Sequence, residues 1–105
     1  MFLDFNRDNQ VNEAEAPQEQ VEDIVNRRLS RIADRVTRAE IHIGHVKESR
    51  TNNPELRCSI EVRPDNLGAV AASAEGVGIE AVVRSACDKV LHAYDKVVGK
   101  QAASR

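Results

Sequence analysis

The side chains of this sequence best suited to chemistry are basic residues spaced along two expected helices. On a helical wheel of 100° per residue, four arginines fall within about 80° of one another: Arg27, Arg31, Arg35 and Arg38. A second narrow row, joined by Ser85, lies near the end of the chain: Lys89, His92, Lys96 and Lys100. Both rows lie away from the apolar stripes of their helices. Two exposed basic rows are typical of proteins that contact the phosphates of a nucleic acid.

Residues for catalysis or for metal binding form no known arrangement. The sequence has no Gly-x-Ser-x-Gly elbow, no phosphate loop ending in Gly-Lys-Ser/Thr and no His-Glu-x-x-His helix. The pair Gly76-x-Gly78 lacks the third glycine of a dinucleotide site. His42 and His45 are expected on opposite sides of a strand, where they do not converge on one metal. We therefore expect a protein that is not an enzyme and that uses no cofactor, no metal and no small-molecule substrate.

The charge of the chain is distributed unevenly. Its 105 residues carry a formal charge of −2, which by itself argues against a wholly basic nucleic-acid-binding protein. Residues 1–26 hold seven acidic residues and one basic residue, a net charge of −6, whereas residues 27–105 carry +4. Aromatic residues make up only 3%, so bases are not expected to stack on the protein. A contact with RNA would therefore involve its backbone and shape.

The cysteine content and the apolar runs indicate the compartment. Two cysteines, Cys58 and Cys87, are too few for a disulfide scaffold and are interpreted as reduced, structural thiols. No apolar run approaches the roughly 20 residues that cross a bilayer, and the first residues do not resemble a signal peptide. We expect a cytoplasmic protein without a membrane partner.

The apolar periodicity predicts six elements in the order β-α-β-β-β-α. The strands are expected over residues 1–5, 38–47, 56–63 and 69–75, and the helices over residues 16–35 and 78–98, with Gly99 as a cap. Pro17 is suited to the first turn of the first helix, and Asn53-Pro54 marks a turn in the polar connection 48–55. The longer helix shows the strongest signal, because apolar residues recur at steps of three and four over five turns.

These elements predict an α+β two-layer sandwich. Two helices with one apolar stripe each would cover one face of a four-stranded, mainly antiparallel sheet and leave the other face in water. With so few aromatic residues, the core must consist of Val, Ile, Leu and Ala. We expect one domain over residues 1–100 and a flexible tail over residues 101–105.

The chain resembles the hibernation-promoting factor and ribosome-associated translation inhibitor family. The resemblance rests on the element order, on Ser73-Ala74-Glu75-Gly76 leading into a long helix, and on Asp88-Lys89 followed by Lys96 and Lys100. It implies a double-stranded-RNA-binding-like fold and the short form of these bacterial proteins. It also implies a partner, the small ribosomal subunit with its ribosomal RNA, whose decoding channel the protein would occupy, blocking translation under stress.

The resemblance also implies which residues bind RNA. They are Arg28, Arg31 and Arg35 on or after the first helix and Lys89, Lys96 and Lys100 on the second. His92 stands where the family has an arginine-like residue, and we include it in the predicted site because it belongs to the same basic row. Valines and Gly99 interrupt the lysine cluster, and the first quarter of the chain is acidic. These features favour an alternative, a divergent protein-interaction or regulatory module that keeps the fold without binding the ribosome. The sequence leaves self-association open.

Overall fold

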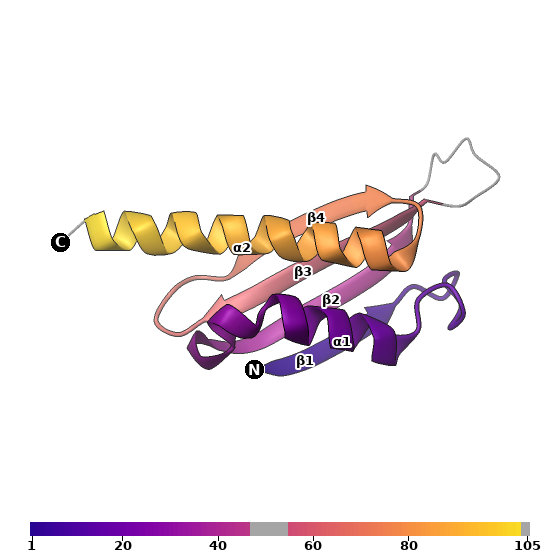
Figure 1. Ribbon diagram of the computed structural model, residues 1–105, viewed down its shortest axis with the longest axis horizontal. Coiled ribbons are helices and arrows are strands. Elements are labelled where there is room, and N and C mark those ends of the chain that lie inside the picture. The colour runs from indigo at the N-terminus through magenta and orange to yellow at the C-terminus, as the bar shows by residue number, and fades with distance from the viewer. Residues whose placement is uncertain (47–54, 104–105) are drawn as a thin grey trace.

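A computed structural model describes residues 1–46 and 55–103, and it shows two helices on one face of a mixed four-stranded sheet (Figure 1). The elements follow one another as β1 (Phe2–Arg7), α1 (Gln18–Arg28), the 3₁₀ helix η1 (Ser30–Arg35), β2 (Val36–His45), β3 (Leu56–Pro64), β4 (Val70–Gly76) and α2 (Ile79–Ala103). The predicted fold class and element order are therefore confirmed. The predicted turn at Asn53-Pro54 lies outside the described residues.

The four strands lie in the order β1-β2-β3-β4. β1 runs parallel to β2, with Phe5 opposite Ile41, because α1 carries the chain back across the sheet between them. The two following pairs are antiparallel, with Ile41 opposite Ile60 and Ile60 opposite Ala72. The sheet is thus mainly antiparallel, as predicted.

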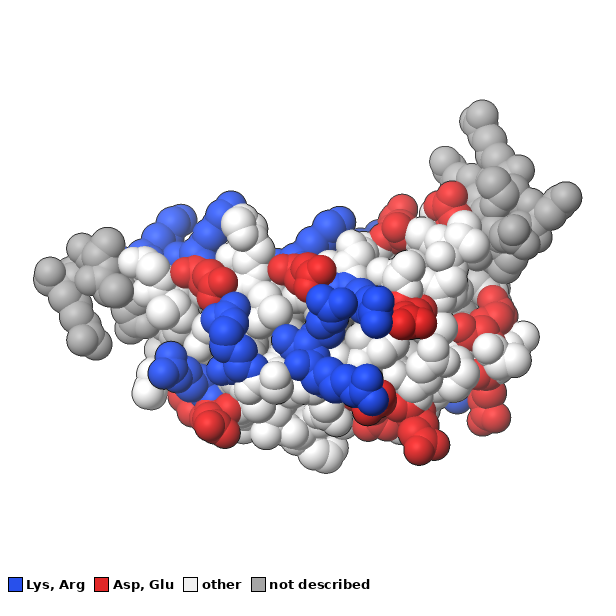
Figure 2. All heavy atoms as spheres, in the orientation of Figure 1, with Lys and Arg blue, Asp and Glu red and all other residues white. Residues whose placement is uncertain are grey.

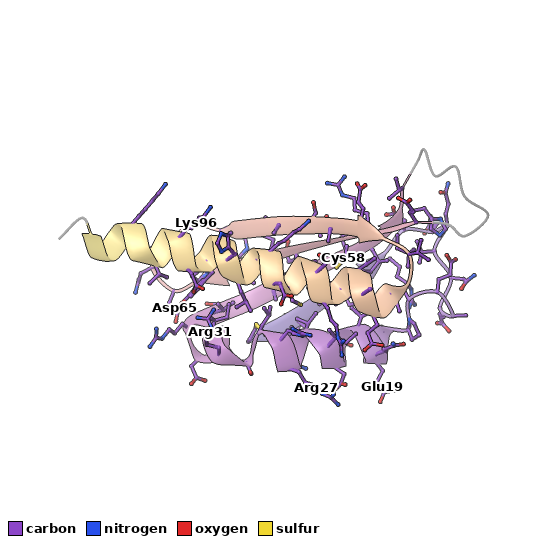
Figure 3. The ribbon with its side chains drawn as sticks, turned by 45° about the horizontal axis from the view of Figure 1, so that its top comes forward. Glu19, Arg27, Arg31, Cys58, Asp65 and Lys96 are labelled. Atoms are coloured by element: carbon purple, nitrogen blue, oxygen red, sulfur yellow. The ribbon has the colours of Figure 1, made fainter. Side chains whose placement is uncertain are left out.

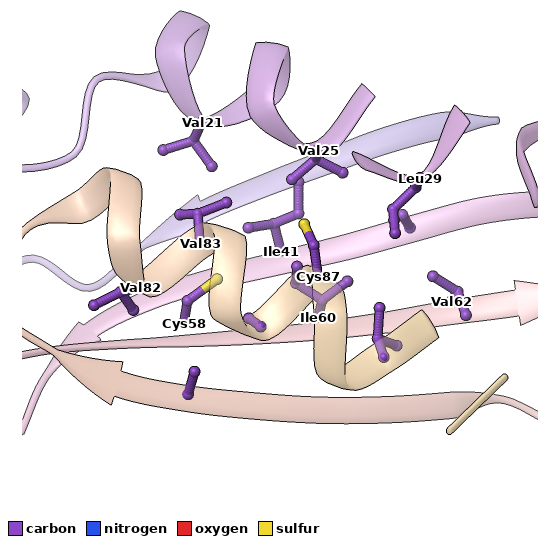
Figure 4. Close-up of a cluster of buried hydrophobic side chains, with 14 of the residues drawn as sticks. Val21, Val25, Leu29, Ile41, Cys58, Ile60, Val62, Val82, Val83 and Cys87 are labelled. Carbon is purple, nitrogen blue, oxygen red and sulfur yellow. The ribbon is translucent and has the colours of Figure 1, made fainter. Parts of the chain in front are cut away.

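The core lies between the sheet and the helices (Figure 4). Alternate residues of β2 and β3 point into it, including Ile41, Ile43, Cys58, Ile60 and Val62, all with no exposed surface. The helices meet these residues with Val21, Val25 and Leu29 and with Val82, Val83 and Val90. Among the described residues, Tyr94 is the one aromatic residue of this buried core, and no polar or charged residue is buried with it. The predicted aliphatic core is confirmed.

The first predicted helix, residues 16–35, is wrong in its second half. The α-helix ends at Arg28, and residues Ser30–Arg35 form a 3₁₀ helix. The Ser30 hydroxyl donates to the Arg27 carbonyl oxygen at 2.9 Å and offers the backbone a local alternative to the α-helical bond. Buried Leu29, at the junction of the two helices, and buried Ile32 of the 3₁₀ helix then face the core. The periodicity predicted the buried apolar positions correctly, but it predicted the wrong type of helix.

The end of the second predicted helix is also different. α2 continues past Val98 and Gly99 to Ala103, so Gly99 is an interior residue of the helix and the predicted cap is wrong. Gly78 at the other end has a φ of +90°, which suits glycine at the turn that leads into α2. Residues 104–105 lie outside the described part of the chain.

Candidate nucleic-acid interface

The basic residues of the first helical segment lie on three elements rather than on one helix. Arg27 and Arg28 end α1, Arg31 and Arg35 belong to η1, and Arg38 is on β2. Arg38 forms an ion pair with Asp4 of β1, and this contact raises the pKa of its guanidinium. The predicted row of four arginines on one helix is therefore wrong, because the chain changes to a 3₁₀ helix and then to a strand. Arg38 does not belong to the helix layer.

Two of the predicted RNA-binding arginines contact acidic residues of α2. Both terminal nitrogens of Arg31 donate to the Asp95 carboxylate at 3.1 Å, and Arg28 lies 3.4 Å from the Asp88 carboxylate. These pairs join the end of α1 and η1 to α2. All four side chains are at least 41% exposed, so each pair contributes less than about 1 kcal/mol to stability. Their larger effect is to offset the positive charge of this surface.

Sequence reasoning missed Arg84, which also lies in the groove between the two helices. Arg84, Arg27 and Arg28 line a hollow of about 220 Å³, together with Gln20, Asp23, Ile24 and Glu80. Arg84 pairs with Glu80 one turn earlier at 2.9 Å. The spacing of Glu80 and Arg84 was visible in the sequence, but it indicated only a local pair. That Arg84 faces α1 follows from the packing of the helices.

The lysines of α2 lie on its other flank. At 100° per residue, Lys89 and Lys96 are about 100° around the helix from Asp88 and Asp95, respectively. Lys96 accordingly lies on the side of α2 turned away from Arg31 (Figure 3). Within the described part of the chain, Lys89 and Lys96 are exposed and form no ion pair. We call Lys89, His92, Lys96 and Lys100 the lysine flank.

Charge varies along the helix layer. Figure 2 shows basic side chains gathered over the middle of this layer and acidic ones mostly at the end where α1 and α2 begin. The acidic end includes Glu19, Glu22 and Asp23 of α1. The acidic and basic residues that are separated along the sequence are therefore separated in space as well, and the lysine flank lies in the basic part of the helix layer.

The open face of the sheet has a different character. Its charges are paired across neighbouring strands: Arg57 with Glu75 at 3.4 Å and Arg38 with Asp4. Phe2 is the exposed aromatic residue of this face among the residues described, with the Arg38 guanidinium 5.9 Å from its ring centre. Paired charges of both signs do not form a continuous path for phosphates, so the helix layer is the better candidate interface.

The two cysteines are buried in the core, as interpreted from the sequence. Burial raises the pKa of the thiols of Cys58 and Cys87 to about 12. The reactive form of cysteine is the thiolate, which is scarce at neutral pH for such thiols. Both residues are free in this structure and belong to packing rather than to a site.

Comparison with known proteins gives a likeness in structure only. No family model matches the sequence, and no curated protein matches it. The N-terminal domain of Protein Y from Thermus thermophilus is similar over 86% of this chain and 91% of that chain, with a TM-score of 0.64 and 19% identity. A ribosomal subunit interface protein from Coxiella burnetii is similar over 97% of this chain and 99% of that chain, with a TM-score of 0.65 and 15% identity.

No helix within the described ranges, residues 1–46 and 55–103, is long and apolar enough to span a membrane.

Both structural neighbours share the arrangement that the sequence predicted, two helices over a four-stranded sheet. The predicted resemblance to hibernation-promoting factors is therefore confirmed at the level of the fold.

Proposed function

We propose that this chain is a non-catalytic ribosome-binding protein that inhibits translation from the decoding channel of the small subunit. The observation that carries the proposal is the lysine flank, where exposed Lys89 and Lys96 form no ion pair with the described residues. Unpaired ammonium groups can replace the counterions of RNA phosphates without first breaking a contact in the protein. The structural neighbours, one of which is named as a ribosomal subunit interface protein, support a ribosomal role.

The predicted site residues contribute unequally in this proposal. Lys89, Lys96 and exposed Arg35 are ready to contact phosphates, whereas Arg28 and Arg31 must first leave Asp88 and Asp95. His92 is exposed on the same flank and can donate a hydrogen bond. The protein would then act as a plug, occupying the space of messenger and transfer RNA without chemistry.

Co-sedimentation with small ribosomal subunits tests the proposal. The double variant Lys89→Glu/Lys96→Glu should lose binding by at least tenfold. Arg57→Glu/Arg63→Glu on the open sheet face is a matched control with the same change in net charge, and its binding should stay near the wild-type level. Equal loss in both variants would show that only net charge matters, and unchanged binding of the lysine variant would exclude this site.

The alternative is a protein-interaction module. It is favoured by the contacts of Arg28 and Arg31 with acidic residues and by the acidic side chains where α1 and α2 begin. A pull-down from a nuclease-treated lysate separates the two functions. A partner that remains after ribosomal RNA has been digested indicates the module, and loss of all partners indicates the ribosome.

A further inference from the structure

The outer edge of β1 pairs with no other strand among the described residues. β1 is the first strand of the sheet, and β2 is its one strand partner among the described residues. Natural proteins commonly guard such edges with charged side chains, above all Lys, with Pro or with a bulge. Residues Phe2–Arg7 contain neither Lys nor Pro, and their register with β2 is continuous. The two charged side chains of β1 are engaged within the protein, Asp4 with Arg38 and Arg7 with Glu13 and the Ala16 carbonyl oxygen. The edge therefore offers a regular row of backbone groups to another strand.

β1 also places apolar side chains at this edge. Two of the three aromatic residues of the chain, Phe2 and Phe5, lie on it. Phe2 is 65% exposed on the open face, and Leu3 and Phe5 are only partly buried on the helix face. The other edge strand, β4, presents mainly small residues such as Ala71 and Ser73. An added strand would remove more apolar surface from water at β1 than at β4.

One hydrogen bond fixes which backbone groups of β1 point outward. The Asp8 N–H donates to the Ile43 carbonyl oxygen of β2 at 2.9 Å. In a parallel pair, every second residue of a strand turns its N–H and C=O toward the neighbour, and the residues between them turn theirs away. Counting back from Asp8, the backbone groups of Leu3, Phe5 and Arg7 face the open edge.

We propose that two copies of this chain associate through β1, antiparallel and with the two-fold axis at Phe5. This register places Leu3 opposite Arg7 of the second copy and Phe5 opposite Phe5, so all outward backbone groups of the strand find partners. On the other face, the Asp4 carboxylate lies opposite the Asn6 amide of the second copy, which can donate to it. The result is a continuous sheet of two four-stranded halves.

The neighbouring registers are less favourable. An axis at Asp4 places two carboxylates directly opposite each other, which destabilises a strand pair. An axis at Asn6 leaves Leu3 beyond the paired region and loses its backbone bonds. The charge pattern of β1 therefore selects the register centred on Phe5.

Sedimentation equilibrium of the full chain tests the association. The wild type should shift from the monomer to twice its mass as the concentration rises. Leu3→Pro removes the outward N–H of residue 3 and should weaken the dimer at least tenfold, whereas Leu3→Ala keeps that N–H and should weaken it less. Circular dichroism confirms that each variant folds. A wild type that stays monomeric throughout overturns the proposal.

Disulfide trapping tests the register, with oxidised glutathione as the oxidant. Phe5→Cys should form a covalent dimer fastest, since its sulfur would face its own counterpart across the axis. Asp4→Cys and Asn6→Cys are matched controls on the same strand. The native thiols are buried and do not compete. Faster trapping of either control, or equal rates for all three variants, would overturn the register centred on Phe5.

Discussion

At the scale of single residues, the bidentate pair of Arg31 and Asp95 limits the positive charge of the helix layer. Sequence reasoning identified Arg31 as a cation of the site but gave Asp95 no role. Their contact connects residues 64 positions apart, and no local pattern predicts it. The acid that offsets a candidate RNA contact can be found only once the two helices are placed side by side.

This pairing leads to a first prediction. Asp95→Asn removes the carboxylate that holds Arg31, so affinity for small subunits should rise about threefold to tenfold, and the free energy of unfolding should fall by less than about 1 kcal/mol. Binding titrations and urea denaturation measure the two quantities. Asp34→Asn is the control, because Asp34 is exposed and forms no ion pair with the described residues. Equal gains in both variants would assign the effect to net charge alone.

Glu15 supports a prediction about pH. The His45 imidazole contacts its carboxylate at 2.7 Å, and this hydrogen bond lowers the pKa of Glu15 below its usual value near 4.5. Because the folded-state pKa is lower than that of the unfolded chain, the carboxylate stabilises the fold above the unfolded-state pKa. That contribution is lost as the pH falls through the folded-state pKa.

Glu15→Gln should therefore lower the free energy of unfolding near pH 6 by less than about 1 kcal/mol. The difference from the wild type should vanish once the pH has fallen below the folded-state pKa of Glu15, where the native carboxyl is also protonated. Urea denaturation across this pH range measures it. Glu13→Gln is the control, since the Glu13 side chain is 89% exposed and lies 3.7 Å from Arg7. A difference that persists in acid would contradict the linkage.

At the scale of elements, the sequence predicts where apolar residues face the core more reliably than it predicts the type of backbone. Leu29 and Ile32 lie on the buried side in either helix, so their periodicity does not distinguish an α-helix from a 3₁₀ helix. The distinction depends on Ser30 and on the chain having to turn into β2. The bounds of β3 are predicted to within one residue, because strict alternation of apolar and polar residues indicates a strand with one buried face.

The two glycines of α2 give a paired prediction. Gly99 lies inside the helix with no atom within 4 Å of an added Cβ, so Gly99→Ala should raise the free energy of unfolding by up to about 1 kcal/mol. Gly78 has a φ of +90°, which strains any residue with a side chain, so Gly78→Ala should lower the free energy of unfolding by about 1–2 kcal/mol. Thermal and urea denaturation measure both. Destabilisation by Gly99→Ala would mean that the helix ends at Gly99 after all.

At the scale of the whole molecule, the two proposed surfaces lie on opposite sides. α1 contacts β1, whereas α2 lies over β3 and β4, and the lysine flank is on the side of α2 away from α1. A dimer formed through β1 would therefore keep both lysine flanks exposed. The net charge of the whole chain does not describe the lysine flank, since most acidic side chains of the helix layer lie at the end where α1 and α2 begin (Figure 2).

The salt dependence of binding tests whether local or net charge governs the interaction. Each phosphate neutralised on RNA contributes about 0.7–0.9 to the slope of log K against log salt. If Arg35, Lys89 and Lys96 each contact one phosphate, the wild-type slope should be between about −2 and −3. Lys89→Glu/Lys96→Glu should then bring the slope close to −1, and Arg57→Glu/Arg63→Glu should leave it unchanged. A shallow wild-type slope would instead favour a protein partner, because such contacts depend less on counterion release.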